Sequence, residues 1–553
     1  MRGANPGWRC SARRCESRRA PYFDIGSASL RRDHSSNPVK PFFITTAIDY
    51  TNAPPHIGHA YEKVLADVIA RWHRERGRHV FLLTGVDQHG QKVQQSAEKA
   101  GMTPAEFAKD VTAKFKALWE KLGIAYDGWA ETTDPRHIAA VQAVLQLLHD
   151  QGDVYKARHS GYYSVRQEQF LTDKERNDQG EFGPEWGEVV FIEEENWYFR
   201  LSKYRPWLAE HIASHPDFVF PSFRGSELAN AVAKEAGDLC ISRPKSRLAW
   251  GIELPFDRNF VTYVWFDALM NYVTFAGYRA AVDAGLPDFE KLWPCDAHVI
   301  GKDILIPAHG IYWPIMLKAA GFEVMPNLLV HGWWNLGGAK VSKSAGNVVD
   351  PDALADRYGC DALRYYLMRD IATGQDADFN EQRLRARYNA DLANDLGNLV
   401  NRTVSMARRY RDGVLAGATA DKSEDAVALE ALGSEAARRF DAAMEGYQVH
   451  SALEAVWELV AAANGFVESS APWKLAKDPS QAARLGEVLC VLVEAARLAA
   501  ALAHPVMPSS ADRILAQLGF AGNLAPVWGV VADGHRVGEP TPVFPRLEDD
   551  QAA

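Results

Sequence analysis

The feature that most constrains the fold is a strand–helix–strand pattern between residues 41 and 87. The run 41–49, PFFITTAID, is β-branched and aromatic, and 79–87, HVFLLTGVD, has the same character; both predict buried strands. Between them, apolar residues spaced by three or four predict one face of a helix that stops near Gly77. They are Tyr61, Val64, Leu65, Val68, Ile69 and Trp72. This order of elements predicts a right-handed βαβ unit in a parallel sheet, and hence an α/β fold.

Two histidines stand at the head of this helix. His56 and His59 follow two prolines in the stretch APPHIGHAY. Ligands of parallel sheets bind at the carboxyl ends of the strands, and the N–H groups of a helix N-terminus attract phosphate. Either histidine alone is more often a surface or capping residue. The pair in this position predicts a phosphate site if a second motif accompanies it.

A loop about 280 residues later is that second motif. The segment KVSKS, residues 340–344, places Lys340 and Lys343 among small neighbours, so that two cations can close over a polyphosphate. Such a segment on its own is usually a solvated loop. Together with the two histidines, at the other side of one parallel sheet, it is strong evidence for a nucleotide site.

Composition excludes several classes of protein. A formal net charge of −10 argues against a uniformly basic nucleic-acid-binding coat. A local basic cluster remains, which can equally be a solvated helix face: Arg402, Arg408, Arg409 and Arg411. No apolar run reaches the roughly 18 residues of a membrane span. The six cysteines are scattered, which indicates a reducing compartment without a disulfide framework, and we expect a cytoplasmic protein.

The residue composition and the apolar pattern change several times along the chain. Residues 1–40 are rich in Arg and Ser and poor in acids, as in a transit peptide, a disordered arm or a stretch upstream of the true start. Apolar strand patterns return in 259–273, 297–317 and 326–334, and we expect these to complete the sheet. The expected organisation is an extension (1–40), a first catalytic half (41–150), a connective insertion (151–245), a second catalytic half (246–335), a lysine-loop region (336–385), a helix bundle (386–545) and a tail (546–553).

The two motifs resemble the HIGH and KMSKS signatures of class I aminoacyl-tRNA synthetases, with Val341 in place of Met. The finer resemblance is to methionyl-tRNA synthetases, over about residues 41–545. It rests on seven pieces in order: YTNAPPHIGHAY, LLTGVDQHGQK, YVWFDALMNYV, IGKDIL, KVSKSAGNVVDP, DLGNLVNRT and APWKLAKD. It implies a doubly wound, Rossmann-like catalytic domain with an inserted connective domain, followed by an all-α anticodon-binding bundle.

The implied reaction joins methionine and ATP into methionyl-adenylate and pyrophosphate, then transfers methionine to the 3′ end of tRNA(Met), for initiation and elongation. The substrate carboxylate is the nucleophile, so the protein must position groups and stabilise charge. The resemblance assigns catalysis to His56, His59, Lys340 and Lys343, with Lys343 the better candidate on the leaving pyrophosphate. It assigns ATP binding to these four with Gly58, Ser342 and Ser344. Mg²⁺ would accompany ATP, bridging its phosphates.

The methionine pocket also follows from the resemblance. Asp87 matches the carboxylate that holds the substrate ammonium, where its local pattern alone suggests only a turn. The matching wall residues are Ala47, Ile48, Tyr50, Trp265, Ala268, Tyr272, Ile304 and His309. Aromatic edges suit the polarisable thioether. The stretch DILIPAHGIYWP is one residue longer than the family pattern, with Pro307 near a usual aromatic, which leaves the place of His309 open.

Zinc knuckles of many relatives have no counterpart in the insertion. Ser164 and Gln167 stand where cysteines would be, and GPEWG supplies none. Because structural zinc needs four S or N ligands, we expect no metal there.

The resemblance places anticodon reading on Asn398, Arg402 and Trp473. The expected partners are tRNA(Met), methionine and ATP, with no membrane, and the expected state is a monomer. Other synthetases fit less well, because the leucine, isoleucine and valine enzymes carry a larger insertion and a cysteine enzyme needs zinc-binding cysteines. A noncatalytic tRNA-binding relative would be expected to lose motif histidines or lysines, and all four are present.

Overall fold

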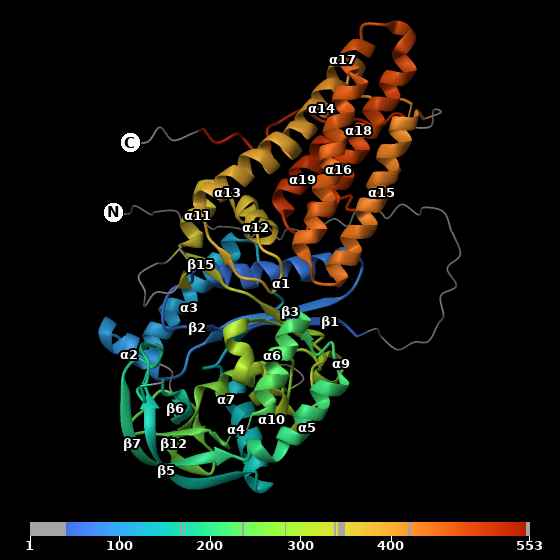
Figure 1. Cartoon of the computed structure of the whole chain (residues 1–553). Coiled ribbons are helices and arrows are strands. Elements are labelled where there is room, and N and C mark those ends of the chain that lie inside the picture. Colours follow the sequence, from blue (N-terminus) through green and yellow to red (C-terminus); the bar gives the residue numbers. More distant parts are fainter. Residues whose placement is uncertain are drawn as a thin grey trace, which may run out of the picture. The chain divides into compact units, whose positions relative to one another are not determined.

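Figure 1 shows the computed structural model of the chain. The structure describes residues 40–165, 169–171, 173–177, 179–234, 237–281, 284–336, 339–340, 349–417 and 422–548. Within that part, seven strands form the main sheet, in the order β2-β3-β1-β13-β14-β8, with β4 paired to β3. Every pairing in it is parallel. The strands are β1 (Phe42–Thr46), β2 (Asp49–Tyr50), β3 (Val80–Asp87), β4 (Gly128–Glu131), β8 (Val219–Phe220), β13 (Ala297–Gly301) and β14 (Leu328–His331).

The predicted βαβ unit is confirmed. Strands β1 and β3 are adjacent and parallel, with Ile44 opposite Leu82, and helix α1 (Ile57–Glu75) joins them. All six apolar positions predicted for one face of this helix are buried. The chain turns out of the helix at Gly77, whose φ of +78° favours glycine.

Both faces of the sheet are covered, as a parallel sheet requires. Phe42 and Ile44 of β1 pack in one core with α1, whereas Phe43 packs in the other core with Val141 of α4. The helices of this part are α2 (Gln91–Ala100), α3 (Pro104–Lys121), α4 (Pro135–Asp150), α5 (Leu201–Ser214), α6 (Ser222–Ala233), α9 (Phe289–Leu292), α10 (Trp313–Ala320), α11 (Pro351–Tyr358) and α12 (Cys360–Arg369).

The segment expected as an insertion, 151–245, contributes strands to three sheets, one of which takes only its last strand, β10 (Ser242–Pro244). It forms an antiparallel sheet from β5 (Val154–Ser164), β6 (Gln169–Leu171), β7 (Val189–Phe199) and β9 (Leu239–Cys240). It also supplies β8, which pairs with β14 in the main sheet. A two-residue strand is too short to show an alternating pattern, so its place in the sheet could not be predicted.

The expectation that 259–273 completes the main sheet is wrong. Strand β12 (Asp257–Thr262) pairs with β10 (Ser242–Pro244) and β11 (Glu253–Leu254) in a separate antiparallel sheet. The residues after it form two short helices, α7 (Val264–Leu269) and α8 (Asn271–Phe275). A short buried apolar run has the same composition in a strand and in a buried helix, so periodicity does not separate them.

Beyond the sheet the chain is mainly helical, as predicted (Figure 1). A small sheet, β15 (Trp334–Leu336), β16 (Ala339–Lys340) and β17 (Ala377–Asp378), precedes the helices α13 (Glu381–Arg387), α14 (Asn398–Arg411), α15 (Glu424–Glu445), α16 (Val449–Ser470), α17 (Pro472–Leu475), α18 (Ala482–Ala503) and α19 (Pro508–Gln517). A π-helical segment, η6 (Tyr388–Gly397), leads into α14. No helix among the described residues is both long and apolar enough to span a bilayer.

Candidate active site

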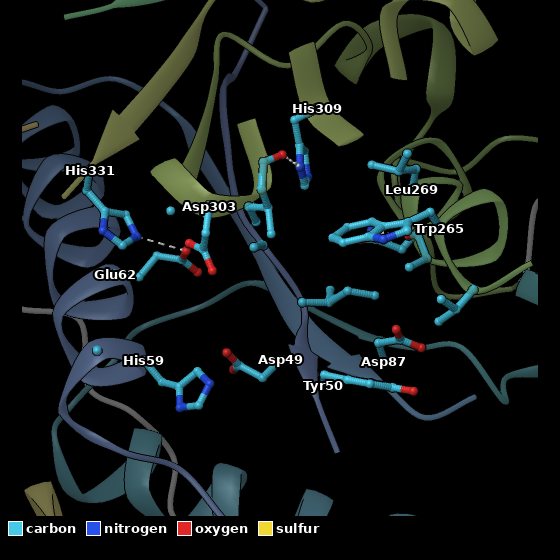
Figure 2. Close-up of a pocket in the computed structure, with 18 of the residues that line it drawn as sticks. Asp49, Tyr50, His59, Glu62, Asp87, Trp265, Leu269, Asp303, His309 and His331 are labelled. Atoms are coloured by element: carbon cyan, nitrogen blue, oxygen red, sulfur yellow. Dashed lines mark hydrogen bonds and ion pairs between the residues drawn. The ribbon is translucent and has the colours of Figure 1, made fainter. Parts of the chain in front are cut away.

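A cavity of about 620 Å³ opens at the carboxyl ends of the central strands (Figure 2). Ala47 follows β1, Asp87 ends β3, Gly301 ends β13 and His331 ends β14, and all four line the cavity. This is the edge at which a parallel α/β sheet binds its ligands.

Most of the predicted site residues meet in this one cavity. Its lining includes Ala47, Ile48, Tyr50, Asp87, Trp265, Ala268, Tyr272, Ile304 and His309 of the predicted methionine site, and His56, Gly58 and His59 of the predicted ATP site. Lys340 belongs to β16, but its side chain lies outside what the structure describes. Ser342, Lys343 and Ser344 also lie outside the described residues.

The two histidines cap helix α1 and stack on each other. His56 Nδ1 accepts the N–H of Gly58 at 3.1 Å, and His59 Nδ1 accepts the N–H of His56 at 3.1 Å. Their ring centroids are 3.8 Å apart. Because each Nδ1 is an acceptor, each neutral ring carries its proton on Nε2. The cap therefore fixes both the tautomer and the direction of two N–H donors at a helix N-terminus.

Residues on both sides of the lysine segment contact pocket elements. At its start, the backbone of Lys340 pairs with Asn335 of β15, next to the pocket residue Trp334. After it, the carbonyl of Val349 accepts the N–H of Ile57, the first residue of α1, at 3.2 Å. Val349 therefore lies against the first turn of the helix that carries His59 and is capped by His56.

The apolar end of the cavity is built around a neutral histidine. His309 Nδ1 donates to the carbonyl of Ile304 at 3.0 Å, and Nε2 accepts from the hydroxyl of Tyr272 at 2.8 Å. Burial lowers the pKa of His309 to about 4, so the ring is uncharged at neutral pH. The ring of Trp265 stands nearly perpendicular to it, with centroids 6.2 Å apart.

The extra residue near Pro307 does not remove His309 from the cavity. Residues Leu305–Tyr312 form the π-helical segment η4, interrupted at Ile306, which has extended φ and ψ values of −116° and 121°. The i→i+5 hydrogen bond of a π-helix encloses one residue more than the i→i+4 bond of an α-helix, so the segment can hold an extra residue. His309 therefore still lines the pocket.

Asp87 is held by donors at the end of β3. Its Oδ1 lies 3.3 Å from the backbone N–H of His89 and 3.5 Å from the hydroxyl of Thr132. The side chain is only 6% exposed, and Figure 2 shows it on the same side of the cavity as Trp265 and Tyr50.

A buried charge cluster in the wall was not predicted from the sequence. Lys63 Nζ donates to Asp49 at 2.6 Å, to Glu62 at 2.7 Å and to the carbonyl of Ala47 at 2.9 Å, and His331 Nε2 lies 3.1 Å from Glu62. Burial by itself would raise the pKa of Glu62, but Lys63 and His331 bring it below its ordinary value. Glu62 lies three residues after His59 on the same helix, and that spacing was an available signal.

Asp303 is a second unpredicted acidic residue of the lining. Its Oδ1 accepts from the indole N–H of Trp333, also in the lining, at 3.0 Å. Asp303 directly precedes Ile304, which the resemblance assigns to the pocket, so its position in the sequence could have identified it.

The described residues contain no group of three or more His, Cys, Asp or Glu side chains that could hold a metal ion. The hydroxyl of Ser164 donates to the carbonyl of Trp186 at 2.5 Å, and Gln167 lies outside the described residues. The absence of zinc from the insertion stays a prediction.

Two of the three predicted anticodon residues are in contact. The guanidinium of Arg402 lies 5.8 Å from the ring centre of Trp473 and pairs with Glu468 at 2.7 Å. Trp473 belongs to α17, just after the helix junction at Ala471, where φ is +43°. Asn398 is exposed one turn before Arg402 on α14.

Comparison with known proteins agrees with this arrangement. Residues 42–179 and 187–404 match the family described as tRNA synthetases class I (M), and 414–553 match the anticodon binding domain of methionyl tRNA ligase. The methionine–tRNA ligase of Lactococcus lactis is 40% identical over 528 residues, which cover 93% of this chain and 78% of that protein. The enzyme of Deinococcus radiodurans is 42% identical over 523 residues, 92% of this chain and 74% of its own.

A solved structure extends this likeness to three dimensions. Mycobacterium tuberculosis methionyl-tRNA synthetase in complex with methionyl-adenylate superposes with a TM-score of 0.85 at 39% identity, covering 92% of this chain and all (100%) of that one. The chain therefore belongs to the methionine–tRNA ligase family of class I tRNA synthetases.

Proposed function

We propose that the cavity binds methionine and ATP side by side, forms methionyl-adenylate and presents it to the 3′ end of tRNA(Met). The observation that carries this proposal is that a single cavity has both kinds of wall. One end offers helix-capping histidines, and the other offers aromatic rings with a buried carboxylate. The two substrates can then meet with the reacting carboxylate directed at the α-phosphorus.

The amino-acid end suits methionine in charge and shape. Asp87 would pair with the substrate ammonium, and the rings of Trp265 and Tyr272 would contact the thioether. The hydroxyl of Tyr272 already donates its hydrogen bond to His309. This end of the pocket is therefore polarisable yet uncharged. A charged or strongly polar side chain would be desolvated there without a partner, which disfavours it.

The ATP end stabilises charge on the phosphates. The Nε2–H groups of His56 and His59 suit phosphate oxygens, each such donor contributing roughly 3–4 kcal/mol of transition-state stabilisation. A Cβ at Gly58 would lie 3.0 Å from His56 Cε1, so glycine supports the stacked cap. We assign the leaving pyrophosphate to Lys340 and Lys343, and further ATP contacts to Ser342 and Ser344. ATP would enter as its Mg²⁺ complex.

Anticodon reading is proposed for the bundle. Single-stranded bases are recognised by stacking on rings and by hydrogen bonds to their edges. Trp473 and Arg402 lie together at a helix junction, and Asn398 is exposed on the same helix as Arg402.

We further propose a cytoplasmic monomer that folds without zinc. Four free thiols in the described part of the chain fit a reducing compartment: Cys240, Cys295, Cys360 and Cys490. Elemental analysis of chelator-washed protein should then find no stoichiometric zinc, and one zinc per chain would contradict this.

The proposed function is tested by ATP–pyrophosphate exchange with a panel of amino acids and no tRNA. We expect exchange with methionine and little with leucine, isoleucine, valine or cysteine. Replacing Lys343 by Ala should lower kcat far more than it raises KM, because the cation acts on the leaving group. Exchange driven by another amino acid, or near wild-type kcat in K343A, would contradict the proposal.

A further inference from the structure

One buried carboxylate behind the pocket has no part in the chemistry described so far. Asp267 lies on α7 between the pocket residues Trp265 and Ala268 and is 1% exposed. Its Oδ2 is 2.7 Å from His89 Nδ1, and its Oδ1 is 2.8 Å from His137 Nε2. We call these three residues the His–Asp–His link.

The link joins three elements that are distant in sequence. His89 lies in the loop between β3 and α2, His137 in the first turn of α4, and Asp267 on α7. Both histidines are buried, at 5% and 0% exposure. A buried carboxylate bonded to two rings therefore fixes the loop, α4 and α7 relative to one another.

The hydrogen bonds of the link have a definite direction. An ionised carboxylate only accepts, so each ring donates to Asp267. His137 Nδ1 is buried without a hydrogen-bond partner in the described part of the chain, so this ring carries its proton on Nε2. Burial alone would raise the pKa of Asp267, but the two imidazoles bring it below its ordinary value.

The link reaches both walls of the amino-acid end of the cavity. On one side, the backbone N–H of His89 donates to Asp87 Oδ1 at 3.3 Å, so holding this ring also holds a donor to that carboxylate. On the other side, Asp267 is two residues from Trp265 on α7. The wall that carries the capping residues His56 and His59 makes none of these hydrogen bonds.

We propose that Asp267 is a positioning residue which, through His89 and His137, sets the separation between Asp87 and Trp265 and so tunes recognition of the amino acid rather than of ATP. This inference rests on the proposed roles of Asp87 and Trp265. An apolar trio could fill the same space, but it would not orient the His89 N–H or fix the rotation of α7.

The test measures KM for methionine and KM for ATP separately, in ATP–pyrophosphate exchange. D267L removes both acceptors, and we expect KM for methionine to rise by about tenfold or more while KM for ATP changes less than about twofold. In D267N, KM for methionine should stay much closer to the wild-type value than in D267L, because an amide can accept a hydrogen bond from one ring and donate one to the other. H89N keeps a donor near the position of Nδ1 and should resemble wild type, whereas H89L should resemble D267L.

A matched control distinguishes positioning from general loss of stability. Glu494, 2% exposed in α18, is a buried carboxylate that pairs with Arg497 at 2.7 Å, within the bundle. E494L should lower the melting temperature without a selective rise in KM for methionine. If D267L does not fold, the H89L and H89N pair decides the question.

The result that would overturn the inference is a D267L or H89L variant whose KM values for methionine and ATP rise equally or not at all. Failure of the proposed function has a different signature, because the wild-type protein would then show no methionine-dependent exchange.

Discussion

At the scale of single residues, one ammonium group organises the acidic wall of the pocket. Lys63 is 1% exposed and bonds Asp49, Glu62 and the carbonyl of Ala47, all three of which line the cavity. ATP is a polyanion, so the carboxylates of Asp49 and Glu62 in the pocket proposed to bind it would repel it unless a cation offsets them. The buried lysine supplies that cation and connects helix α1 to the turn after β1.

Replacing Lys63 by Met is therefore expected to destabilise the fold. Removing one partner of a buried ion pair leaves the other charges uncompensated, which costs about 3–5 kcal/mol of the free energy of unfolding. Urea titration measures the loss. The matched control is K114M, whose pair with Asp110 is half exposed, at 51% for each side chain; it should change stability by less than about 1 kcal/mol. Similar losses in both variants would contradict this role of Lys63.

His309 gives the stability a defined pH dependence. Burial lowers its pKa to about 4 from an ordinary value of 6.5. Between pH 6.5 and about pH 4, His309 binds a proton in the unfolded chain but not in the folded chain. The free energy of unfolding therefore falls as the pH decreases. The loss from this residue should total about 3 kcal/mol between pH 6.5 and pH 4.

The H309Q variant tests this prediction because it removes the titrating ring. Thermal or urea unfolding at several pH values should show a shallower loss of stability in H309Q than in wild type over that interval. Parallel curves for the two proteins would show that His309 titrates equally in the folded and unfolded states.

At the scale of elements, the long periodic segments could be predicted and the short ones could not. Helix α1 has 19 residues, enough for a repeating apolar face, and the sequence predicts both strands beside it. Strand β8 has two residues and α7 has six, too few to display a period. The sequence pattern therefore does not indicate β8 and predicts a strand where α7 lies.

The same limit applies to the site. Asp87 and His59 lie in motifs that a family resemblance identifies. The contact between Glu62 and His331 spans 269 positions and exists only once β14 is in the sheet. Pairings of this kind depend on tertiary structure, and no local pattern encodes them.

Trp473 follows the helix junction at Ala471, where a base of an unpaired loop can reach a ring. If its indole stacks on an anticodon base, W473A should lose ~1–3 kcal/mol of tRNA interaction, measured by binding or by KM for tRNA. ATP–pyrophosphate exchange without tRNA should be unchanged. The control is W528A, another partly buried tryptophan of the bundle, which packs against Gly433 and should leave tRNA binding intact. Loss of both reactions in W473A, or of neither, would contradict the assignment.

At the scale of the whole molecule, helix α1 connects the catalytic part to the bundle. Its N-terminus carries the capping histidines, and its middle is tied through Asp67 to Arg364, a fully buried residue of α12, at 2.6 Å. Arg364 also donates to the carbonyls of Pro505 and Val506 after α18, at 3.0 and 2.8 Å. Buried hydrogen bonds therefore join the two functional parts through one helix.

We propose that one cavity receives methionine at one end and ATP at the other. Binding of a non-hydrolysable methionyl-adenylate analogue, measured by calorimetry, tests it most directly because the analogue occupies both ends. We predict one site per chain, weakened at least about tenfold by D87A and unchanged by W473A, which lies in the bundle. Equal affinity of wild type and D87A for the analogue would show that Asp87 does not hold the substrate ammonium in this cavity.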